Sequence, residues 1–410
     1  MRQWMVAAKK ADFYAIAEKF HVDPVVARII RNREVIGEKN IRIYLGGNLS
    51  DLSDPHQMKD MDRLVEILAQ KIRKQVHIRI IGDYDVDGET SSHLFLTALR
   101  RVGAKVDVVI PHRIQDGYGL SLHLLQQAKE DGVDTILTCD NGIAAIDEIA
   151  WAKAQKMTVL VTDHHAVPFE EHEGRRTEKK SLADAVVNPH QQDCGYPYKE
   201  LCGAGVAWNV IRVLYENYDM DKREAEDLLD FVAMATVCDV MSLTGENRIL
   251  VKEGLKRIRH TKNIGLQALM QACNVQPENI SAYHFGYVLG PCVNATGRLD
   301  TARHALRLFE TGQETEAEEI ARDLVDLNQE RKELTLQGVE MAKKLCEEGG
   351  YENDPVLVLF LPDVHESIAG LIAGRIREMY NRPVFVLTRG EEGVKGSGRS
   401  TENYSMYENM

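Results

Sequence analysis

Long hydrophobic runs are missing from this sequence, and so are the cysteine patterns of two common classes of protein. No stretch approaches the roughly 18 uninterrupted apolar residues of a membrane span, and the amino terminus, MRQWMVAAKKADFY, lacks the apolar core of a signal peptide. The seven cysteines are odd in number and form no CxxC pair, which excludes a disulfide framework and a zinc signature. These absences predict a cytoplasmic protein that does not contact a membrane.

An excess of positive charge is also missing. The formal net charge is -13 over 410 residues, which argues against a protein that coats nucleic acid by charge alone but leaves room for a local basic channel. Apolar content of 44% and charged content of 28% are those of a folded soluble protein. No internal repeat is present, and the length predicts two or three domains.

What the sequence does contain is a series of short apolar runs, rich in Val and Ile, that alternate with helical stretches from residue 76 onwards. The runs are 76–82, 104–111, 133–140, 157–163 and 183–189. Continuous apolar strands that alternate with helices are typical of a parallel sheet buried on both faces. The sequence therefore predicts an α/β fold with a doubly wound parallel sheet, whose ligand site lies beyond the carboxyl ends of the strands.

Acidic and histidine side chains follow three of these runs. They are Asp83, Asp85 and Asp87 after the first run, Asp140 after the third, and Asp163, His164 and His165 after the fourth. Carboxylates and imidazoles are ligands for hard and borderline metal ions. Because the carboxyl ends of parallel strands meet at one edge of a sheet, these side chains predict a metal site at that edge.

The motif DYDVDG at 83–88 has two other interpretations. It resembles the start of a calcium-binding EF-hand loop, but such a loop needs a Glu at its twelfth position and a helix on either side. Here the twelfth position is Leu94, and a predicted strand precedes the motif. Alternatively an aspartate caps the following helix, which explains only one of the three carboxylates.

Three alternating carboxylates repel one another unless a cation is present, which favours a metal site. In a hydrolytic two-metal site, Asp140 suits the bridge between the ions, His164 suits a ligand, and His165 suits an outer or substrate-facing position. Mixed Asp and His ligation favours Mn²⁺, Mg²⁺ or Zn²⁺ over Ca²⁺.

Four regions are predicted along the chain: a helical amino-terminal segment at 1–75, a catalytic domain at 76–262, a connecting region at 263–350 and a small α/β domain at 351–410. An apolar helix is expected within 224–244, with Asp239 as a carboxylate in apolar surroundings. The segment from 314 to 350 has helical periodicity, no proline and a glycine stop, so one long helix is expected to bridge domains.

Four segments in chain order, GDYDVDG, TCDNG, TDHH and ATVCDV, resemble the acidic motifs of the DHH phosphoesterase superfamily. The segments PHRIQDGYGLS, VVNPHQQDCGYPYKELCGAGVAW, TGENR and LGPCVNATGRLD are similar to its RecJ branch, the single-strand-specific 5′ to 3′ DNA exonucleases. The resemblance runs from the amino-terminal helices to the last residue. It implies a DHH catalytic domain followed by part of a second domain of the DHHA1 type.

The resemblance also implies two divalent ions, Mn²⁺ or Mg²⁺, held by the four motifs. The implied ligands are Asp83, Asp85, Asp87, Asp140, His164 and Asp239. Asp163 is implied to orient a histidine, and His165 to contact the scissile phosphate. Catalytic roles are therefore expected of Asp85, Asp140, His164 and His165.

Further matches imply contacts with the substrate. Besides His165, the implied residues are Arg113, Tyr118, Asn294, Arg298, Lys395, Ser397 and Arg399. The last three belong to the glycine-rich segment GVKGSGRS, which is expected to form a loop whose backbone N–H groups approach phosphate oxygens.

The implied function is the release of 5′-mononucleotides from single-stranded DNA, in repair and recombination, by two-metal hydrolysis. One alternative is a DHH hydrolase of oligoribonucleotides or cyclic dinucleotides, which the RecJ-like helices before the first motif and the NATGRLD segment disfavour. Another is a non-catalytic RecJ-like binding subunit, which the complete set of ligand positions disfavours. The expected partners are single-stranded DNA and a single-strand-binding protein or helicase, and the chain is expected to be a monomer.

The sequence departs from the family pattern at its end and at one motif position. It stops at Met410, without the GGHxxA-like segment that usually completes DHHA1 and without the OB-fold that grips single-stranded DNA. We therefore expect a piece of a longer protein, with incomplete DNA binding. His112 stands where the family usually has Asn, a change expected to be tolerated.

Overall fold

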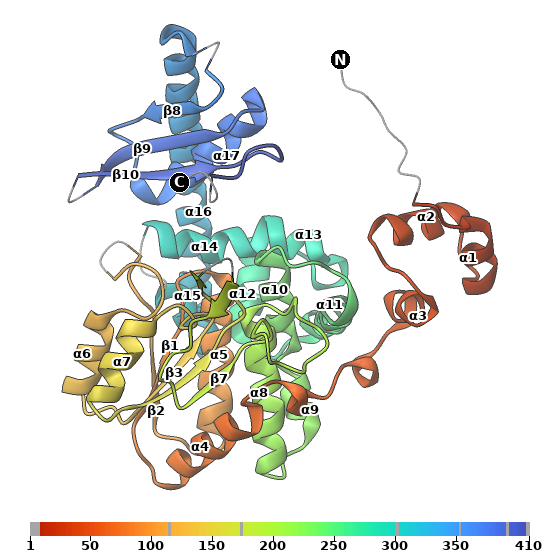
Figure 1. Ribbon diagram of the computed structural model, residues 1–410, viewed down its shortest axis with the longest axis vertical. Helices are drawn as coiled ribbons and strands as arrows, with labels where there is room; N and C mark the ends of the chain where they lie inside the picture. Colours follow the sequence, from red (N-terminus) through yellow and green to blue (C-terminus); the bar gives the residue numbers. More distant parts are fainter. Residues whose placement is uncertain are drawn as a thin grey trace.

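The computed structural model describes residues 9–113, 116–172, 175–299, 303–351, 354–390 and 393–406. In this part of the chain the main sheet has five parallel strands in the order β2-β1-β3-β4-β7 (Figure 1). The strands are β1 (Ile78–Ile81), β2 (Val106–Val109), β3 (Thr135–Cys139), β4 (Thr158–Thr162) and β7 (Ala185–Val187). Each lies within one of the predicted apolar runs, so the α/β fold with a parallel sheet is confirmed.

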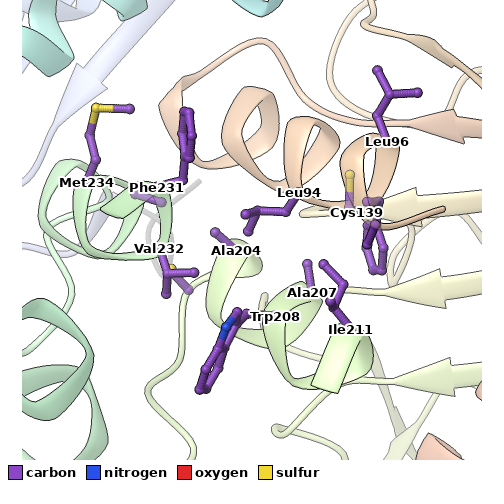
Figure 2. Close-up of a cluster of buried hydrophobic side chains, with 14 of the residues drawn as sticks. Leu94, Leu96, Cys139, Ala204, Ala207, Trp208, Ile211, Phe231, Val232 and Met234 are labelled. Atoms are coloured by element: carbon purple, nitrogen blue, oxygen red, sulfur yellow. The ribbon is translucent and has the colours of Figure 1, made fainter. Parts of the chain in front are cut away.

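Helices cover both faces of this sheet. The helices are α4 (Met61–Arg73), α5 (Val86–Arg101) and α8 (Gly203–Asn217) on one face, and α6 (Leu122–Glu130) and α7 (Ile146–Ala154) on the other. Neighbouring residues of a strand point to opposite faces of the sheet. Ile80 packs in the core on the α5 side, and Ile81 packs in the core on the α6 side. Figure 2 shows buried side chains of α5, α8 and α10 (Leu229–Cys238) meeting in the larger core.

The strand order places the ends of β1 and β3 at a topological switch point. The chain leaves β1 for β2 on one side of it, then returns across the sheet to β3 on the other side. In open α/β sheets the crevice at such a reversal, outside the carboxyl ends of the strands, is where ligands bind. The loops that follow β1 and β3 carry Asp83, Asp85 and Asp140, and Asp87 lies in the first turn of α5.

A helical region follows the sheet. Its elements are α9 (Lys222–Glu226), α11 (Gly245–Arg257), α12 (Ile264–Ala272), α13 (Ala282–His284), the π-helix η5 (Phe285–Leu289), α14 (Gly290–Leu299) and α15 (Arg303–Glu310). The predicted long helix is confirmed as α16 (Glu314–Glu348). The larger core includes residues from Met58, in the amino-terminal region, to Leu324 on α16, and helix α4 packs in it. The predicted domain boundaries at residues 75, 262 and 350 stay predictions.

A second, smaller core belongs to the carboxyl-terminal region. Here a sheet in the order β10-β9-β8, made of β8 (Leu357–Phe360), β9 (Val384–Gly390) and β10 (Gly393–Arg399), packs with α17 (Ala369–Tyr380). The distal part of α16 contributes Val339, Ala342 and Cys346 to this core, so one helix joins the two regions (Figure 1).

One prediction for this region is wrong. The glycine-rich segment GVKGSGRS is not a loop, because Gly393–Arg399 forms the edge strand β10, antiparallel to β9. Two of its glycines are needed because neighbouring side chains leave no room for a Cβ atom. An added Cβ at Gly396 would lie 2.4 Å from Leu387, and one at Gly398 would lie 2.5 Å from the sulfur of Met406.

Three amino-terminal helices form a small cluster of their own at the side of the body (Figure 1). They are α1 (Phe13–Phe20), α2 (Pro24–Asn32) and α3 (Glu38–Gly46). A two-stranded hairpin, β5 (Phe169–His172) and β6 (Arg175–Glu178), follows β4 and was not predicted. Among the described residues, no helix combines the length and the apolar character that crossing a membrane requires.

Candidate metal centre and substrate cleft

The acidic loop after β1 is held by the start of α5. Asp85 is the N-cap of that helix, and its carboxylate accepts hydrogen bonds from the backbone N–H groups of Asp87 (3.0 Å) and Gly88 (3.1 Å). The capping interpretation therefore holds for one aspartate of the three, and the other two need another explanation. Burial and the neighbouring charge of Asp87 raise the pKa of Asp85.

Asp87 is held by the amino terminus of α8. Its two carboxylate oxygens accept hydrogen bonds from the backbone N–H groups of Gly203 (2.6 Å) and Ala204 (2.7 Å), which are free at a helix start and favour a negative charge. An added Cβ at Gly203 would lie 2.6 Å from Cβ of Asp140, so only glycine lets α8 approach this closely.

Asp83 and Asp140 are buried carboxylates whose oxygens are poorly paired. Both oxygens of Asp83 and Oδ1 of Asp140 have no hydrogen-bond partner among the described residues. Burial, followed by the charge of Asp85, raises the pKa of Asp83 to about 8, and burial with the charge of Asp87 raises the pKa of Asp140 well above its ordinary value. Asp140 has a φ of +62°, a conformation that is uncommon for a non-glycine residue and that marks strained functional sites.

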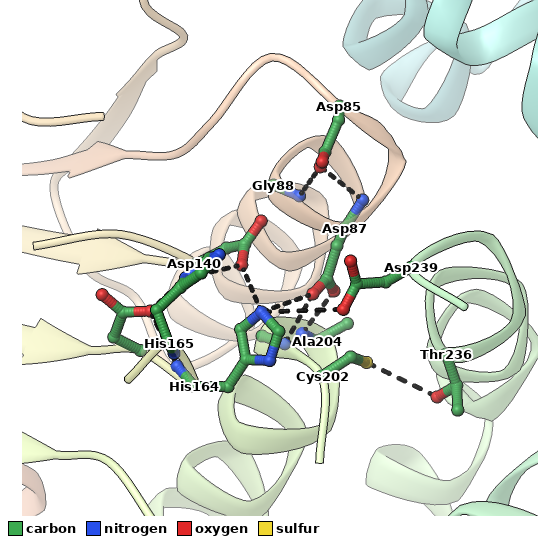
Figure 3. A network of polar contacts seen from close by, with 12 residues as sticks. Asp85, Asp87, Gly88, Asp140, His164, His165, Cys202, Ala204, Thr236 and Asp239 are labelled. Atoms are coloured by element: carbon green, nitrogen blue, oxygen red, sulfur yellow. Dashed lines mark hydrogen bonds and ion pairs between the residues drawn. The ribbon is translucent and has the colours of Figure 1, made fainter. Parts of the chain in front are cut away.

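His164 lies at the centre of the cluster (Figure 3). Its Nε2 atom is 3.0 Å from Oδ1 of Asp140, 3.6 Å from Oδ2 of Asp87 and 3.7 Å from Oδ2 of Asp239. The ring nitrogen and three carboxylates from separate segments thus converge on one small volume. This is the convergence of strand ends that the sequence predicted.

His165 points toward solvent and is fixed by Asp163. One oxygen of Asp163 accepts hydrogen bonds from the backbone N–H of His164 (2.7 Å) and from Nδ1 of His165 (2.8 Å). Burial alone would raise the pKa of Asp163, but the hydrogen bond and charge of His165 outweigh it and hold that pKa below the usual range. Burial opposes the protonation of His165, yet Asp163 raises the pKa of the imidazole to about 8. The hydroxyl of Tyr118 is 3.0 Å from Nε2 of the same ring.

The sequence suggested that Asp239 lies inside an apolar helix, but the structure places it just after the helix end. Helix α10 ends at Cys238, and Asp239 is its C-cap, with 27% of its side chain exposed beside His164. Burial and the charges of Asp87 and Asp85 raise the pKa of Asp239 to about 8. An uncompensated carboxylate at the negative end of a helix is unfavourable, so this position also favours a cation.

The side chains form three groups, each able to offer ligand atoms within 4.8 Å of one another. Asp140, His164 and His165 make up one group, which overlaps two groups that share no residue with each other. Of these two, one is Asp83, Asp85 and Asp140, and the other is Asp87, His164 and Asp239. Asp140 lies between them, because its Oδ1 is 3.0 Å from His164. Like charges that are buried together and lack partners destabilise the protein unless a cation neutralises them. The donor set therefore fits two divalent ions with Asp140 facing both.

A cationic cleft of about 300 Å³ separates the acidic site from the carboxyl-terminal sheet. The predicted substrate residues that line it are Arg113, Tyr118, Arg298, Lys395, Ser397 and Arg399. Arg298 joins the two regions, since its Nη1 donates to the carbonyl oxygen of Ser367 at 2.8 Å. Burial and the charge of Arg113 lower the pKa of Arg298 to about 10, so a bound anion would relieve the repulsion.

Two other predicted contacts differ from expectation. Asn294 lies against the acidic loop, where its side-chain oxygen accepts a hydrogen bond from the backbone N–H of Val86 (3.2 Å). Lys395, Ser397 and Arg399 are alternate residues of β10, so their side chains rather than a loop backbone face the cleft.

Sequence reasoning missed several contributors. Gly203 and Ala204 hold Asp87, and only the small residues of CGAGVAW hinted at a close helix start. Tyr84 lines the cleft, with the Arg113 guanidinium 4.6 Å from its ring centroid. Glu89 is fully buried beneath the loop, where burial and the charge of Asp85 raise its pKa well above the ordinary value.

Comparison with known proteins agrees with this geometry. Residues 77–236 match the DHH family, N-terminal domain. The single-stranded-DNA-specific exonuclease RecJ of Haemophilus influenzae is 36% identical over 397 residues, which cover 93% of this chain and 67% of that protein. The chain belongs to the RecJ family. The RecJ of Bacillus subtilis is 32% identical, and the match covers 97% of this chain and 49% of that protein. The chain thus spans from about half to about two thirds of the length of these relatives.

Solved RecJ structures share the fold. A crystal structure of exonuclease RecJ bound to manganese superposes with a TM-score of 0.73 at 32% identity, covering 86% of this chain and 84% of that one. RecJ of Thermus thermophilus in complex with Mn²⁺ gives a TM-score of 0.76 at 29% identity, covering 96% of this chain and 54% of that one. The RecJ fold thus extends over both cores.

Proposed function

We propose that this RecJ-family chain is a single-strand-specific DNA exonuclease that hydrolyses phosphodiester bonds with two divalent ions, Mn²⁺ or Mg²⁺. The observation that carries the proposal is a cluster of carboxylates beside a cationic cleft, in which both oxygens of Asp83 and Oδ1 of Asp140 are buried without a hydrogen-bond partner among the described residues. Its relatives are named as single-stranded-DNA-specific exonucleases, and solved RecJ structures hold Mn²⁺ or Mg²⁺. The proposed role is in DNA repair and recombination.

In this proposal Asp83, Asp85 and Asp140 hold one ion, while Asp87, His164 and Asp239 hold the other. When bound, such a pair of ions supplies a nucleophile by lowering the pKa of water and neutralises charge that develops on phosphate oxygens. The backbone N–H groups at the start of α8 fix the orientation of the Asp87 carboxylate through hydrogen bonds. Metal ligands in proteins are commonly oriented by hydrogen bonds to neighbouring groups in this way.

His165 is proposed to donate a hydrogen bond to the scissile phosphate. Asp163 fixes its ring, and the hydrogen bond and charge of Asp163 raise the pKa of the imidazole, which favours its protonated form. Its side chain is 44% exposed, on the side of the cluster where Tyr118 also lies. A protonated imidazole held in place before the reaction stabilises developing negative charge without reorganisation.

The cationic cleft is proposed to hold the 5′ end of the strand. Arg113, Arg298 and Arg399 bind backbone phosphate there, and Tyr84 and Tyr118 offer rings for base stacking. The volume of the cleft, about 300 Å³, is at the lower end of the range of small-ligand sites. In this proposal a strand that enters by its 5′ end is shortened in the 5′ to 3′ direction and releases 5′-mononucleotides, and contacts to phosphate and stacked bases need no base readout.

The deciding experiment is digestion of 5′-labelled and 3′-labelled single strands, of DNA and of RNA, with Mn²⁺, Mg²⁺ or EDTA. We expect 5′-labelled DNA to lose its label at once as a mononucleotide, and 3′-labelled DNA to shorten stepwise. Activity that survives EDTA would rule out the metal mechanism, and cleavage of dinucleotides alone would indicate an oligonucleotide hydrolase. The proposed monomeric state and the proposed binding of a single-strand-binding protein or helicase are tested by sedimentation and by co-purification.

Metal ions are expected to raise the melting temperature of the protein. Because Asp83 and Asp239 bind protons more tightly when folded than when unfolded, the free energy of unfolding of the metal-free protein falls as pH rises from about 4 to about 8. Saturating Mn²⁺ at pH 8 removes this penalty and should add about 5 °C or more by mass action. Thermal melts with Mn²⁺ and with EDTA, at pH 6 and pH 8, measure the effect. An equal melting temperature with and without metal at pH 8 would contradict the assignment.

Arg399→Ala is expected to weaken binding of single-stranded DNA by about tenfold and to reduce the salt dependence of binding by about one phosphate contact. Arg389 gives a matched control, because it is an exposed arginine on the adjacent strand β9 and pairs with Val394, not with the cleft-facing residues of β10. Fluorescence anisotropy of a labelled strand over a range of salt concentrations measures both variants. Equal losses for Arg389→Ala and Arg399→Ala would show that the cleft face has no special role.

A further inference from the structure

A stacked pair of tyrosines is exposed on the helix that leads to the candidate site. The ring centroids of Tyr283 and Tyr287 are 5.1 Å apart, and the rings are inclined by 24°. Their exposed fractions are 63% and 73%. Aromatic side chains bury most of their apolar area in a core or an interface, so a pair that is already stacked and faces solvent indicates a binding surface.

The buried side of this helix packs against the end of α10. Cys238 donates a hydrogen bond from Sγ to the carbonyl oxygen of Phe285 (3.4 Å), and an added Cβ at Gly290 would lie 2.3 Å from the same sulfur. An added Cβ at Gly286 would meet Val237 at 3.4 Å. Since Asp239 is the residue after Cys238, the helix that presents the two tyrosines packs directly against the end of α10 that carries this carboxylate.

The same helix continues into the site. After Tyr287 it reaches Asn294, which contacts the acidic loop, and then Arg298 in the cationic cleft. Asn294 lies seven positions after Tyr287, about 10 Å along the helix, a distance that a stacked strand covers in about three nucleotides. The tyrosines lie on the π-helix η5 and next to it, and π-helical turns are frequent at functional sites.

Apolar surface is also exposed at the end of α10. Val240, the residue after Asp239, is 87% exposed and has a φ of +57°. A β-branched residue is strained in this conformation, and such strain is typical of residues near functional sites. Exposed apolar surface therefore directly follows Asp239 in the chain.

We infer that Tyr283 and Tyr287 form a stacking platform for bases of the DNA strand on the 3′ side of the scissile phosphate. The inference rests on the proposed function, because it extends the same substrate beyond the metal centre. Stacking accepts every base, since each base presents a π face, so the platform adds affinity without sequence preference. A strand too short to reach the platform gains nothing from it.

The test compares a strand of about twenty nucleotides with a dinucleotide that carries a 5′ phosphate. In Tyr283→Ala/Tyr287→Ala, KM for the long strand is expected to rise about tenfold or more, in the range of base-aromatic stacking, while KM and kcat for the dinucleotide change less than about twofold. Tyr283→Phe/Tyr287→Phe should keep the KM of the wild type. Tyr14→Ala removes another exposed tyrosine, 77% exposed on the amino-terminal helix α1, and should change neither substrate.

Binding measured in EDTA separates this inference from the proposed function. If the wild type binds the long strand and the double Ala variant binds it about tenfold more weakly, the platform stands even if the wild type cuts nothing. Equal binding and equal KM in the two proteins would overturn the platform and leave the exonuclease proposal intact. Equal losses on both substrates would show a structural role for the tyrosines and would also overturn the platform. A wild type that binds no strand in EDTA and cuts none with Mn²⁺ would overturn both proposals.

Discussion

Asp140→Ala is expected to lower kcat for single-stranded DNA by about a thousandfold or more. Asp140 lies between the two groups of ligand atoms, with its carboxylate 3.0 Å from His164, so its loss disturbs the binding of both ions. Charge stabilisation by such ions contributes several kcal/mol to the transition state, and about 4 kcal/mol corresponds to a thousandfold in rate. Rates of release of labelled mononucleotide, with Mn²⁺ in excess, measure the effect.

The same substitution should not destabilise the metal-free protein. Burial and four neighbouring carboxylates oppose the charge of Asp140, and Nε2 of His164, 3.0 Å from Oδ1, is the imidazole contact that the variant loses, so on balance removing the charge removes repulsion. We expect Asp140→Ala to melt in EDTA at or above the temperature of the wild type, and to lose the increase that Mn²⁺ gives. Asp193→Ala, which removes an exposed carboxylate paired with Lys59, is the control and should keep full activity. Wild-type activity in Asp140→Ala would contradict the two-ion proposal.

His165→Ala is expected to lower kcat by about a hundredfold while metal binding is kept. The imidazole is one residue away from His164 in sequence, but it is fixed by Asp163 and faces solvent, so it belongs to the substrate side of the site. A positioned proton donor contributes about a hundredfold or more to the rate. Rates at saturating substrate, together with the melting temperature in Mn²⁺, separate a lost substrate contact from a lost ligand.

A histidine of similar surroundings gives the control for this prediction. His123 is also paired with an aspartate, Asp116, at 2.8 Å, but its side chain is 73% exposed on α6. His123→Ala should leave kcat unchanged. If His165→Ala instead abolished the increase in melting temperature that Mn²⁺ gives, His165 would be a metal ligand and its assignment to the substrate side would be wrong.

The sheet and its acidic edge could be predicted because each depends on local patterns. A strand buried on both faces appears in sequence as an unbroken apolar run, and a polar residue directly after it lies at the sheet edge. Thus Asp83, Asp140 and His164 converge as expected, although they are far apart in sequence. Long helices with regular periodicity are similarly readable, as α16 is.

Features set by distant contacts could not be predicted. GVKGSGRS appeared to be a loop because glycines favour turns, whereas Gly396 and Gly398 are small to make room for Leu387 and Met406. The end of α10 at Cys238 was hidden because the apolar pattern continues beyond it, while Asp239 turns out toward His164. The hydrogen bond from the backbone N–H of Gly203 to Asp87 joins residues that are 116 positions apart, and a single sequence does not reveal such a contact.

Helix α16 links the chemistry of this protein to its mechanics. Its 35 residues place Leu324 in the core that carries the carboxylates and Val339 in the core that carries β10. A continuous helix holds its ends apart through backbone hydrogen bonds along its whole length, unlike a loop, whose ends can drift. The helix thus sets the distance between the carboxyl-terminal sheet and the carboxylate cluster. If the proposed function is right, that distance is expected to set the size of the product that each cleavage releases.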